Sequence, residues 1–154
     1  MTVLVTGAGG LIASRIVHKL VEQGEEVLAL DRVSPLSGLE ELQQHGKVRV
    51  AEADVTDLSA IETAISDNQV SRIIHTAAIL PPTSEEDPSR GCDVNIGGTN
   101  NIFDAPSRLG VKRVVYPSSI AVYGDQSDHG ETVLNEGSLR FPFSLYGVAS
   151  KPTS

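Results

Sequence analysis

A cluster of small residues near the start of the chain has the spacing needed to bind a phosphate group. Gly7, Gly10 and Ala13 stand three positions apart within the segment Thr6–Ala13. A glycine at the first position allows a tight turn after a strand, and a glycine at the second lets the backbone approach a pyrophosphate closely. A small residue at the third position lets the following helix pack near the strand, so that the free N–H groups of the helix face the anion.

An acidic residue stands where a dinucleotide-binding unit needs one. Asp31 ends the second predicted strand, 24 residues after Gly7, close to the spacing of about 20 residues expected for a carboxylate that binds ribose. Such a carboxylate accepts hydrogen bonds from the ribose hydroxyls of adenosine and repels a 2′-phosphate. Arg32, the next residue, could in principle bind that phosphate. The sequence therefore favours NAD over NADP as the ligand.

Alternating strand and helix patterns would position these residues. Short β-rich apolar runs predict strands, and apolar residues at helical spacing predict helices. The predicted strands are 2–6, 27–30, 47–50, 72–75 and 111–116, and the predicted helices are 11–23, 39–44, 57–66 and 88–108. From Ser119 to Tyr146 we expect mostly loops. The alternation predicts an α/β fold, a Rossmann-like doubly wound parallel sheet, and right-handed crossovers favour the strand order 3-2-1-4-5.

The composition indicates one globular domain over residues 1–154 and argues against several partners. The net charge is −8, whereas nucleic acid and anionic membranes require a basic surface, so we expect neither. No apolar run approaches the roughly 18 residues of a membrane helix. Cys92 is the single cysteine and the first strand begins at Thr2, so we expect a cytoplasmic protein. A solvated loop, rather than a metal site, is expected for Asp125, Asp128 and His129.

Six segments follow one another along about residues 2–148. They are Thr6–Ala13, Asp54-Val55, His75–Ala78, Asp93–Asn100, Ser118–Gly124 and Pro142–Tyr146. In this order they resemble the T-G-x-x-G-x-x-G turn, the Asp-hydrophobic pair, and the H-x-A-A, N-V-x-G-T-x-N, S-S-x-x-V-Y-G and P-x-S-x-Y-G segments of one family. On these motifs the chain resembles the extended short-chain dehydrogenase/reductases, the NAD-dependent epimerase/dehydratase family of the UDP-glucose 4-epimerase type.

The resemblance implies an oxidoreductase that transfers hydride between NAD and the carbinol of a small substrate, such as a nucleotide sugar. Ser119 would hydrogen-bond the reacting oxygen, Tyr146 would act as the acid and base, and Lys151 is the candidate for the catalytic ammonium. The sequence leaves a homodimer open. The predicted cofactor-binding residues are Gly7, Gly10, Leu11, Ile12, Ala13, Asp31, Arg32, Asp54, Val55, Thr76, Ala77, Ala78, Asn95 and Ser118.

The end of the chain departs from the family pattern. The family lysine lies four residues after the tyrosine, but here position 150 is serine and Lys151 lies five residues after Tyr146. On a helix the fourth residue lies about 40° from the first and the fifth about 140°. Pro152 also disfavours helical geometry at Lys151. We therefore expect a broken helix in which Lys151 faces away from Tyr146.

Family members continue for roughly as many residues again, with further strands and a substrate-binding region. We therefore expect that the C-terminal strands and the substrate domain are lacking here. The favoured interpretation is a truncated family member, inactive as an isolated chain. The alternative is a naturally short protein that serves as a non-catalytic NAD(P)-binding or regulatory module.

Overall fold

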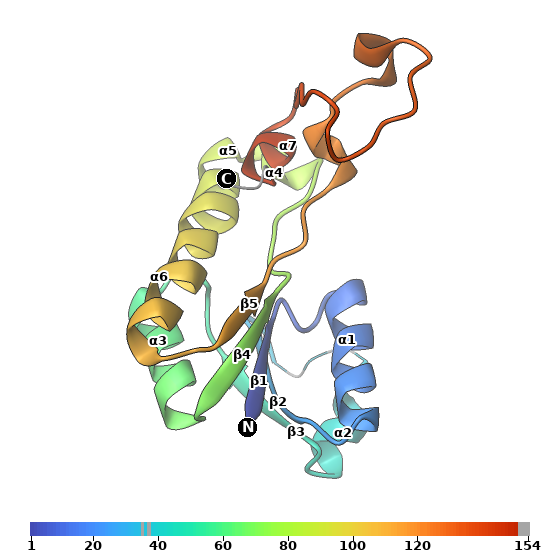
Figure 1. Cartoon of the computed structure of the whole chain (residues 1–154). Helices are drawn as coiled ribbons and strands as arrows, with labels where there is room; N and C mark the ends of the chain where they lie inside the picture. The colour runs from blue at the N-terminus through green and yellow to red at the C-terminus, as the bar shows by residue number, and fades with distance from the viewer. Residues whose placement is uncertain (35, 37, 151–154) are drawn as a thin grey trace.

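Five parallel strands form a single sheet in the computed structural model, which describes residues 1–34, 36 and 38–150 (Figure 1). The strands are β1 (Thr2–Thr6), β2 (Glu26–Asp31), β3 (Val48–Glu52), β4 (Val70–His75) and β5 (Arg113–Val115). Their order is β3-β2-β1-β4-β5, which confirms the predicted doubly wound arrangement. The central strand β1 is buried at all five positions, because helices cover both faces of the sheet.

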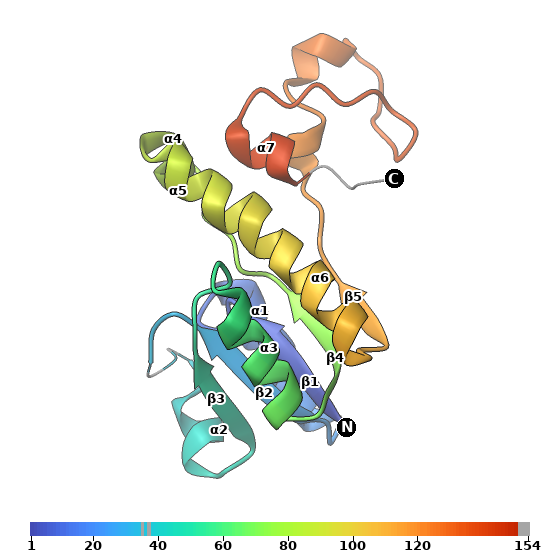
Figure 2. The ribbon, with the colours of Figure 1, turned by 90° about the vertical axis from the view of Figure 1, so that its left-hand side faces the viewer.

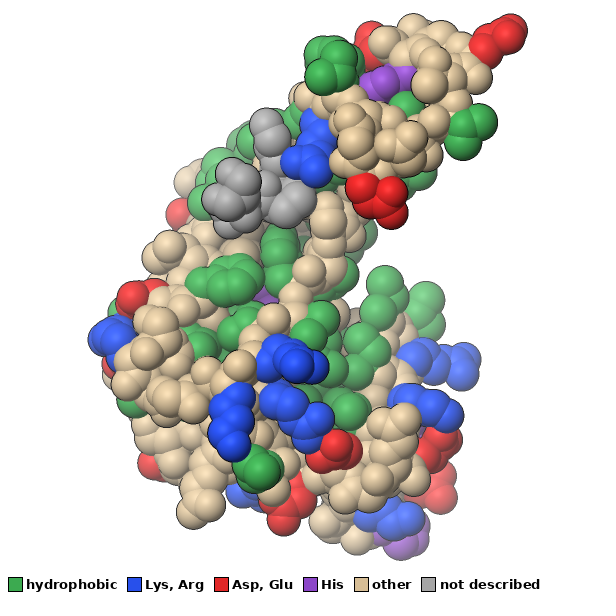
Figure 3. All heavy atoms as spheres, viewed as in Figure 1, with side chains coloured by type: hydrophobic (Ala, Val, Ile, Leu, Met, Phe, Trp, Pro, Cys, Tyr) green, Lys and Arg blue, Asp and Glu red, His purple; other side chains and the backbone are tan. Residues whose placement is uncertain are grey.

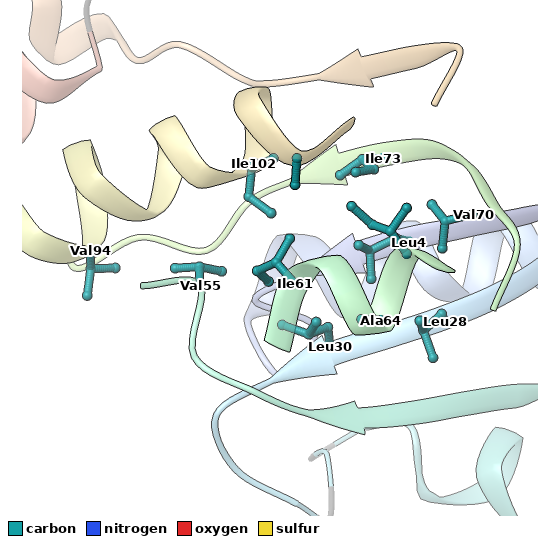
Figure 4. Packing of buried hydrophobic residues seen from close by; sticks show 12 residues of the cluster. Leu4, Leu28, Leu30, Val55, Ile61, Ala64, Val70, Ile73, Val94 and Ile102 are labelled. Atoms are coloured by element: carbon teal, nitrogen blue, oxygen red, sulfur yellow. The ribbon is translucent and has the colours of Figure 1, made fainter. Parts of the chain in front are cut away.

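The two faces of the sheet receive different helices (Figures 1 and 2). On one face, α1 (Leu11–Glu22) and α2 (Glu40–Gln44) flank a cluster that includes Val3 and Val5 of β1. On the other face, α3 (Leu58–Asp67) and α6 (Thr99–Leu109) pack over Leu4, with Ile61 and Ile102 among the buried contacts (Figure 4). Successive side chains of a strand point to opposite faces, so one apolar run serves both cores.

The helix predicted over 88–108 is continuous but not uniform. It begins as α5 (Pro88–Cys92), passes through the π-helical stretch η1 (Asp93–Gly98) and continues as α6 (Figure 2). A Cβ at Gly98 would lie 2.5 Å from Cγ2 of Val55, so the absence of a side chain lets this stretch approach the end of β3. Such π-bulges are frequent beside functional sites, and this one runs along the carboxyl end of the sheet.

The remaining elements are short and lie beyond the carboxyl ends of the strands (Figure 1). They are α4 (Thr83–Glu86), η2 (Ile120–Val122), η3 (Gln126–His129) and α7 (Leu145–Ala149). The single turn of α4 was not predicted, because four residues are too few to show helical periodicity. The strand predicted over 111–116 was too long at both ends. The N–H of Val111 donates to the carbonyl of Pro106 at the end of α6, 3.2 Å away, instead of joining the sheet.

None of the helices in the described part of the chain is both long and apolar enough to cross a bilayer.

We expect Ile102→Ala to lower the free energy of unfolding by about 2–5 kcal/mol, because it leaves a cavity between α6 and the sheet. Ile102 is fully buried, whereas Leu109 at the end of the same helix is exposed. Leu109→Ala is therefore the matched control, with an expected loss of about 0.5 kcal/mol. Urea unfolding followed by circular dichroism measures both, and equal losses would contradict this account of the core.

Candidate functional site

A cavity of about 500 Å³ opens at the carboxyl ends of the strands, where open α/β sheets place their ligands. In the space-filling view the molecule is hollowed between the body of the sheet and the loops that follow β5, and hydrophobic side chains line this hollow (Figure 3). Most of the predicted site residues line the cavity: Gly7, Gly10, Leu11, Ile12, Ala13, Asp31, Arg32, Asp54, Val55, Thr76, Ala77, Ala78, Ser118 and Tyr146.

The glycine turn after β1 forms the floor of the cavity. Gly7 has φ +68°, and a Cβ there would lie 2.8 Å from the backbone N and Cα of Ala77, so a larger residue is excluded both by conformation and by space. The N–H of Gly10 donates to the carbonyl of Gly7 over 2.9 Å. Gly10 precedes α1 and offers no side-chain cap to the helix. The first N–H groups of α1 are thereby available to an anionic ligand.

Asp31 lies beside this turn and is held by two backbone groups. Its Oδ2 accepts from the N–H of Gly9 over 2.9 Å, and its Oδ1 accepts from the N–H of Arg32 over 2.7 Å. The carboxylate is thus oriented at the end of β2 while it still lines the cavity. This is the position from which an acid binds ribose hydroxyls in dinucleotide-binding folds.

The buried side chain of His75, the last residue of β4, lines the cavity. Nδ1 of His75 lies 2.7 Å from Oγ1 of Thr6, and Nε2 lies 3.0 Å from Oγ1 of Thr99. The ring stacks on Tyr116 with a centroid distance of 5.4 Å. Burial lowers the pKa of His75 to about 4, so the ring is neutral at physiological pH and acts as a hydrogen-bonding link between β1, β4 and α6.

Two further polar residues hold the walls of the cavity. Oδ1 of Asp54 accepts from N and Oγ1 of Thr56, at 2.9 and 2.8 Å, while Oδ2 pairs with Arg90 of α5. Burial raises the pKa of Asp54, but these hydrogen bonds outweigh it and the pKa lies below its usual value. The amide of Asn95 bonds both N and O of Ile79 at 2.8 Å. Asn95 therefore positions the segment after β4 and does not itself line the cavity.

The predicted catalytic residues are only partly brought together. Tyr146 on α7 lines the cavity, and so does the predicted cofactor-binding residue Ser118, whose Oγ donates to the carbonyl of Ser150 over 2.9 Å. Ser119 does not line it; its Oγ accepts from the N–H of Ala121 over 3.2 Å at the start of η2. Lys151 lies outside the described residues, and α7 itself ends at Ala149.

The predicted site residues did not include four cavity residues with polar side chains, which are His75, Arg90, Tyr116 and Ser150. Tyr116 follows β5, and its hydroxyl donates to the carbonyl of Ala149 over 3.4 Å. Burial raises its pKa. Its place as the last residue of a predicted strand was the available signal for Tyr116. Arg90 carried no such signal, because it occupies an ordinary helical position. Within the described residues, no three potential ligands cluster as a metal site would require.

Comparisons with known proteins agree on one family. Residues 3–151 match the sequence model of the NAD dependent epimerase/dehydratase family. UDP-glucose 4-epimerase of Lacticaseibacillus casei is 29% identical over 148 residues, which cover 96% of this chain and 43% of that protein. A 3 beta-hydroxysteroid dehydrogenase/Delta 5-->4-isomerase of Mycobacterium tuberculosis is 35% identical over 125 residues, 78% of this chain and 32% of that protein.

Solved structures give the same result. UDP-glucose 4-epimerase of Thermus thermophilus, in complex with NAD, superposes with a TM-score of 0.85 at 32% identity, covering 97% of this chain and 47% of the other. The epimerase of Bifidobacterium longum, in complex with NAD+ and UDP, has a TM-score of 0.83 at 27% identity, with 97% and 46% covered. The chain thus spans less than half the length of these similar proteins.

The buried histidine predicts a pH-dependent stability. Because the pKa of His75 is about 4 when folded and near 6.5 when unfolded, the unfolded chain binds an extra proton between these values. The free energy of unfolding should therefore fall as pH decreases from about 6.5 to about 4, by up to about 3 kcal/mol. Urea unfolding at several pH values tests this. His75→Gln should flatten the dependence, and an equally steep dependence in that variant would refute this role of His75.

Proposed function

Because the chain belongs to the NAD dependent epimerase/dehydratase family, we propose that its cavity binds NAD and that the chain forms the cofactor-binding part of an oxidoreductase. The observation that carries this proposal is the pairing of the uncapped start of α1 with the oriented carboxylate of Asp31 around one cavity. The helix start accepts the pyrophosphate and Asp31 accepts hydrogen bonds from the adenosine ribose. The carboxylate at this position also disfavours the 2′-phosphate of NADP.

The proposed chemistry is hydride transfer to and from a substrate carbinol. NAD supplies the hydride acceptor, and the protein supplies orientation and proton transfer. Tyr146 is the proposed acid and base because it faces the cavity that holds the glycine turn. Ser119 is the proposed hydrogen-bond partner of the reacting oxygen and Lys151 the proposed ammonium. The proposed substrate is a nucleotide sugar, supported by similar structures that were solved with UDP or UDP-glucose.

A second candidate is a non-catalytic NAD(P)-binding or regulatory module. One observation favours it: the cavity contains Tyr146 but not Ser119, whose Oγ is engaged by the N–H of Ala121. A module of this kind binds the cofactor without turning over a substrate. Cofactor binding alone therefore supports both candidates, whereas turnover by the chain would support only the oxidoreductase.

We expect Asp31→Asn to weaken NAD+ binding by about tenfold, because an amide accepts ribose hydrogen bonds less strongly than a carboxylate. The affinity for NADP+ should change less, since the repulsion of its 2′-phosphate is removed. Isothermal titration calorimetry of the chain with both dinucleotides measures the ratio. Glu41→Gln removes one exposed charge away from the cavity and should bind as the unmodified chain does. Absence of NAD+ binding by the folded chain would refute the proposal.

Tyr146→Phe separates binding from chemistry. It removes only the hydroxyl, so NAD+ affinity should stay within about twofold while proton transfer is lost. The assay incubates each chain with NAD+ and UDP-glucose and measures the C4 epimer of the sugar nucleotide by chromatography. Product from the unmodified chain and none from Tyr146→Phe supports the oxidoreductase. NAD+ binding with no product from either chain is the result expected both of a truncated family member and of the non-catalytic module, and equal product from both removes Tyr146 from the mechanism.

A further inference from the structure

The short helix α7, which carries Tyr146, depends on other elements for its position. It has five residues, and an isolated helix of that length is not stable in water. At its end, the hydroxyl of Tyr116 donates to the carbonyl of Ala149 over 3.4 Å. Just beyond it, Oγ of Ser118 donates to the carbonyl of Ser150 over 2.9 Å. The segment after β5 therefore holds the end of α7, and its start needs contacts of its own.

The start of α7 lies against α4 and α5 (Figure 1). Oε1 of Glu85, on α4, accepts from the N–H of Leu145 over 3.1 Å. Leu145 is the first residue of α7, so its N–H has no acceptor within the helix. Its side chain lies over Gly91 of α5, where a Cβ would approach Cδ2 of Leu145 to 2.8 Å. Leu145 is thus held through both its backbone and its side chain, one residue before Tyr146.

We propose that Glu85 is a positioning residue for Tyr146. Its carboxylate holds the first N–H of α7 and thereby sets where the phenol of the next residue enters the cavity. A group that transfers a proton must lie within hydrogen-bond reach of the reacting atom, and a displacement of about 1 Å can cost much of the rate. Glu85 does not line the cavity, so it acts through α7. This inference rests on the proposed acid and base role of Tyr146.

Glu85→Ala removes the acceptor and should loosen the start of α7. The N–H of Leu145 should then exchange with solvent about fivefold faster, which corresponds to the loss of one hydrogen bond. Glu85→Gln keeps an acceptor oxygen and should restore the exchange rate to within about twofold of that of the unmodified chain. Glu86→Ala is the matched control, because Glu86 is exposed on the same helix while the N–H of Leu145 bonds Glu85. Hydrogen exchange followed by NMR measures each chain.

The ring signal of Tyr146 gives a readout at the proposed catalytic group itself. The chain has three tyrosines, so isotopically labelled tyrosine gives three ring signals, which phenylalanine substitutions assign. In Glu85→Ala the Tyr146 signal should move toward that of free tyrosine, and in Glu85→Gln it should return. The Tyr123 signal should stay unchanged in both, because its hydroxyl donates over 3.1 Å to the carbonyl of Asn135, which lies outside α7. A general loss of stability would not single out one tyrosine.

The possible results distinguish this inference from the proposed function. If the Leu145 exchange rate and the Tyr146 signal change in Glu85→Ala, recover in Glu85→Gln and stay unchanged in Glu86→Ala, the positioning role is supported. If neither changes in Glu85→Ala, or if Glu86→Ala changes both equally, the role of Glu85 is overturned while the NAD site stands. If the folded, unmodified chain does not bind NAD+ in calorimetric titration, the proposed function is refuted and the inference falls with it.

Discussion

The close contact between the turn after β1 and the segment after β4 organises the rest of the site. Gly7 leaves room for the backbone of Ala77, which a Cβ would approach to 2.8 Å. Oγ1 of Thr76 donates to the carbonyl of Thr6 over 2.7 Å, so the two chain segments are joined where the strands end. Because β1 and β4 are neighbours whose connections cover opposite faces of the sheet, the cavity opens between them.

A layer of buried polar groups supports this contact and extends it toward the catalytic candidates. His75 links Thr6 to Thr99, and each nitrogen of its ring has a partner. A buried polar ring without partners would be strongly destabilising, so this arrangement makes the positions of β1, β4 and α6 depend on one another. Tyr116 stacks on that ring and also bonds the carbonyl of Ala149. The cofactor side of the cavity and α7 are thus connected through one side chain.

Prediction succeeded where the signal is local and failed where it depends on contacts distant in the sequence. The strand over 2–6 was predicted with its observed bounds because all its residues are apolar or β-branched. The structure buries all five of them. A helix was predicted to begin at residue 57, and the side chain of Asp57 caps α3 by accepting from the N–H of Ala60 over 3.0 Å. The π-helical stretch 93–98 was not anticipated. Its close approach to Val55 joins residues separated by the whole of α3 and β4.

The same difference between local signals and distant contacts decides which residues of the candidate site were predicted. The sequence by itself determined the glycine turn, the acid at position 31 and the strand order, because turn geometry, strand-end chemistry and crossover handedness are rules of local backbone structure. Only the tertiary structure decided that Asn95 holds Ile79 instead of lining the cavity, that Ser119 is engaged by its own loop, and that Arg90 meets Asp54. The outcomes for Asn95 and Arg90 depend on how α5 and η1 lie against the ends of β3 and β4, and no local pattern encodes the direction of a side chain between packed elements.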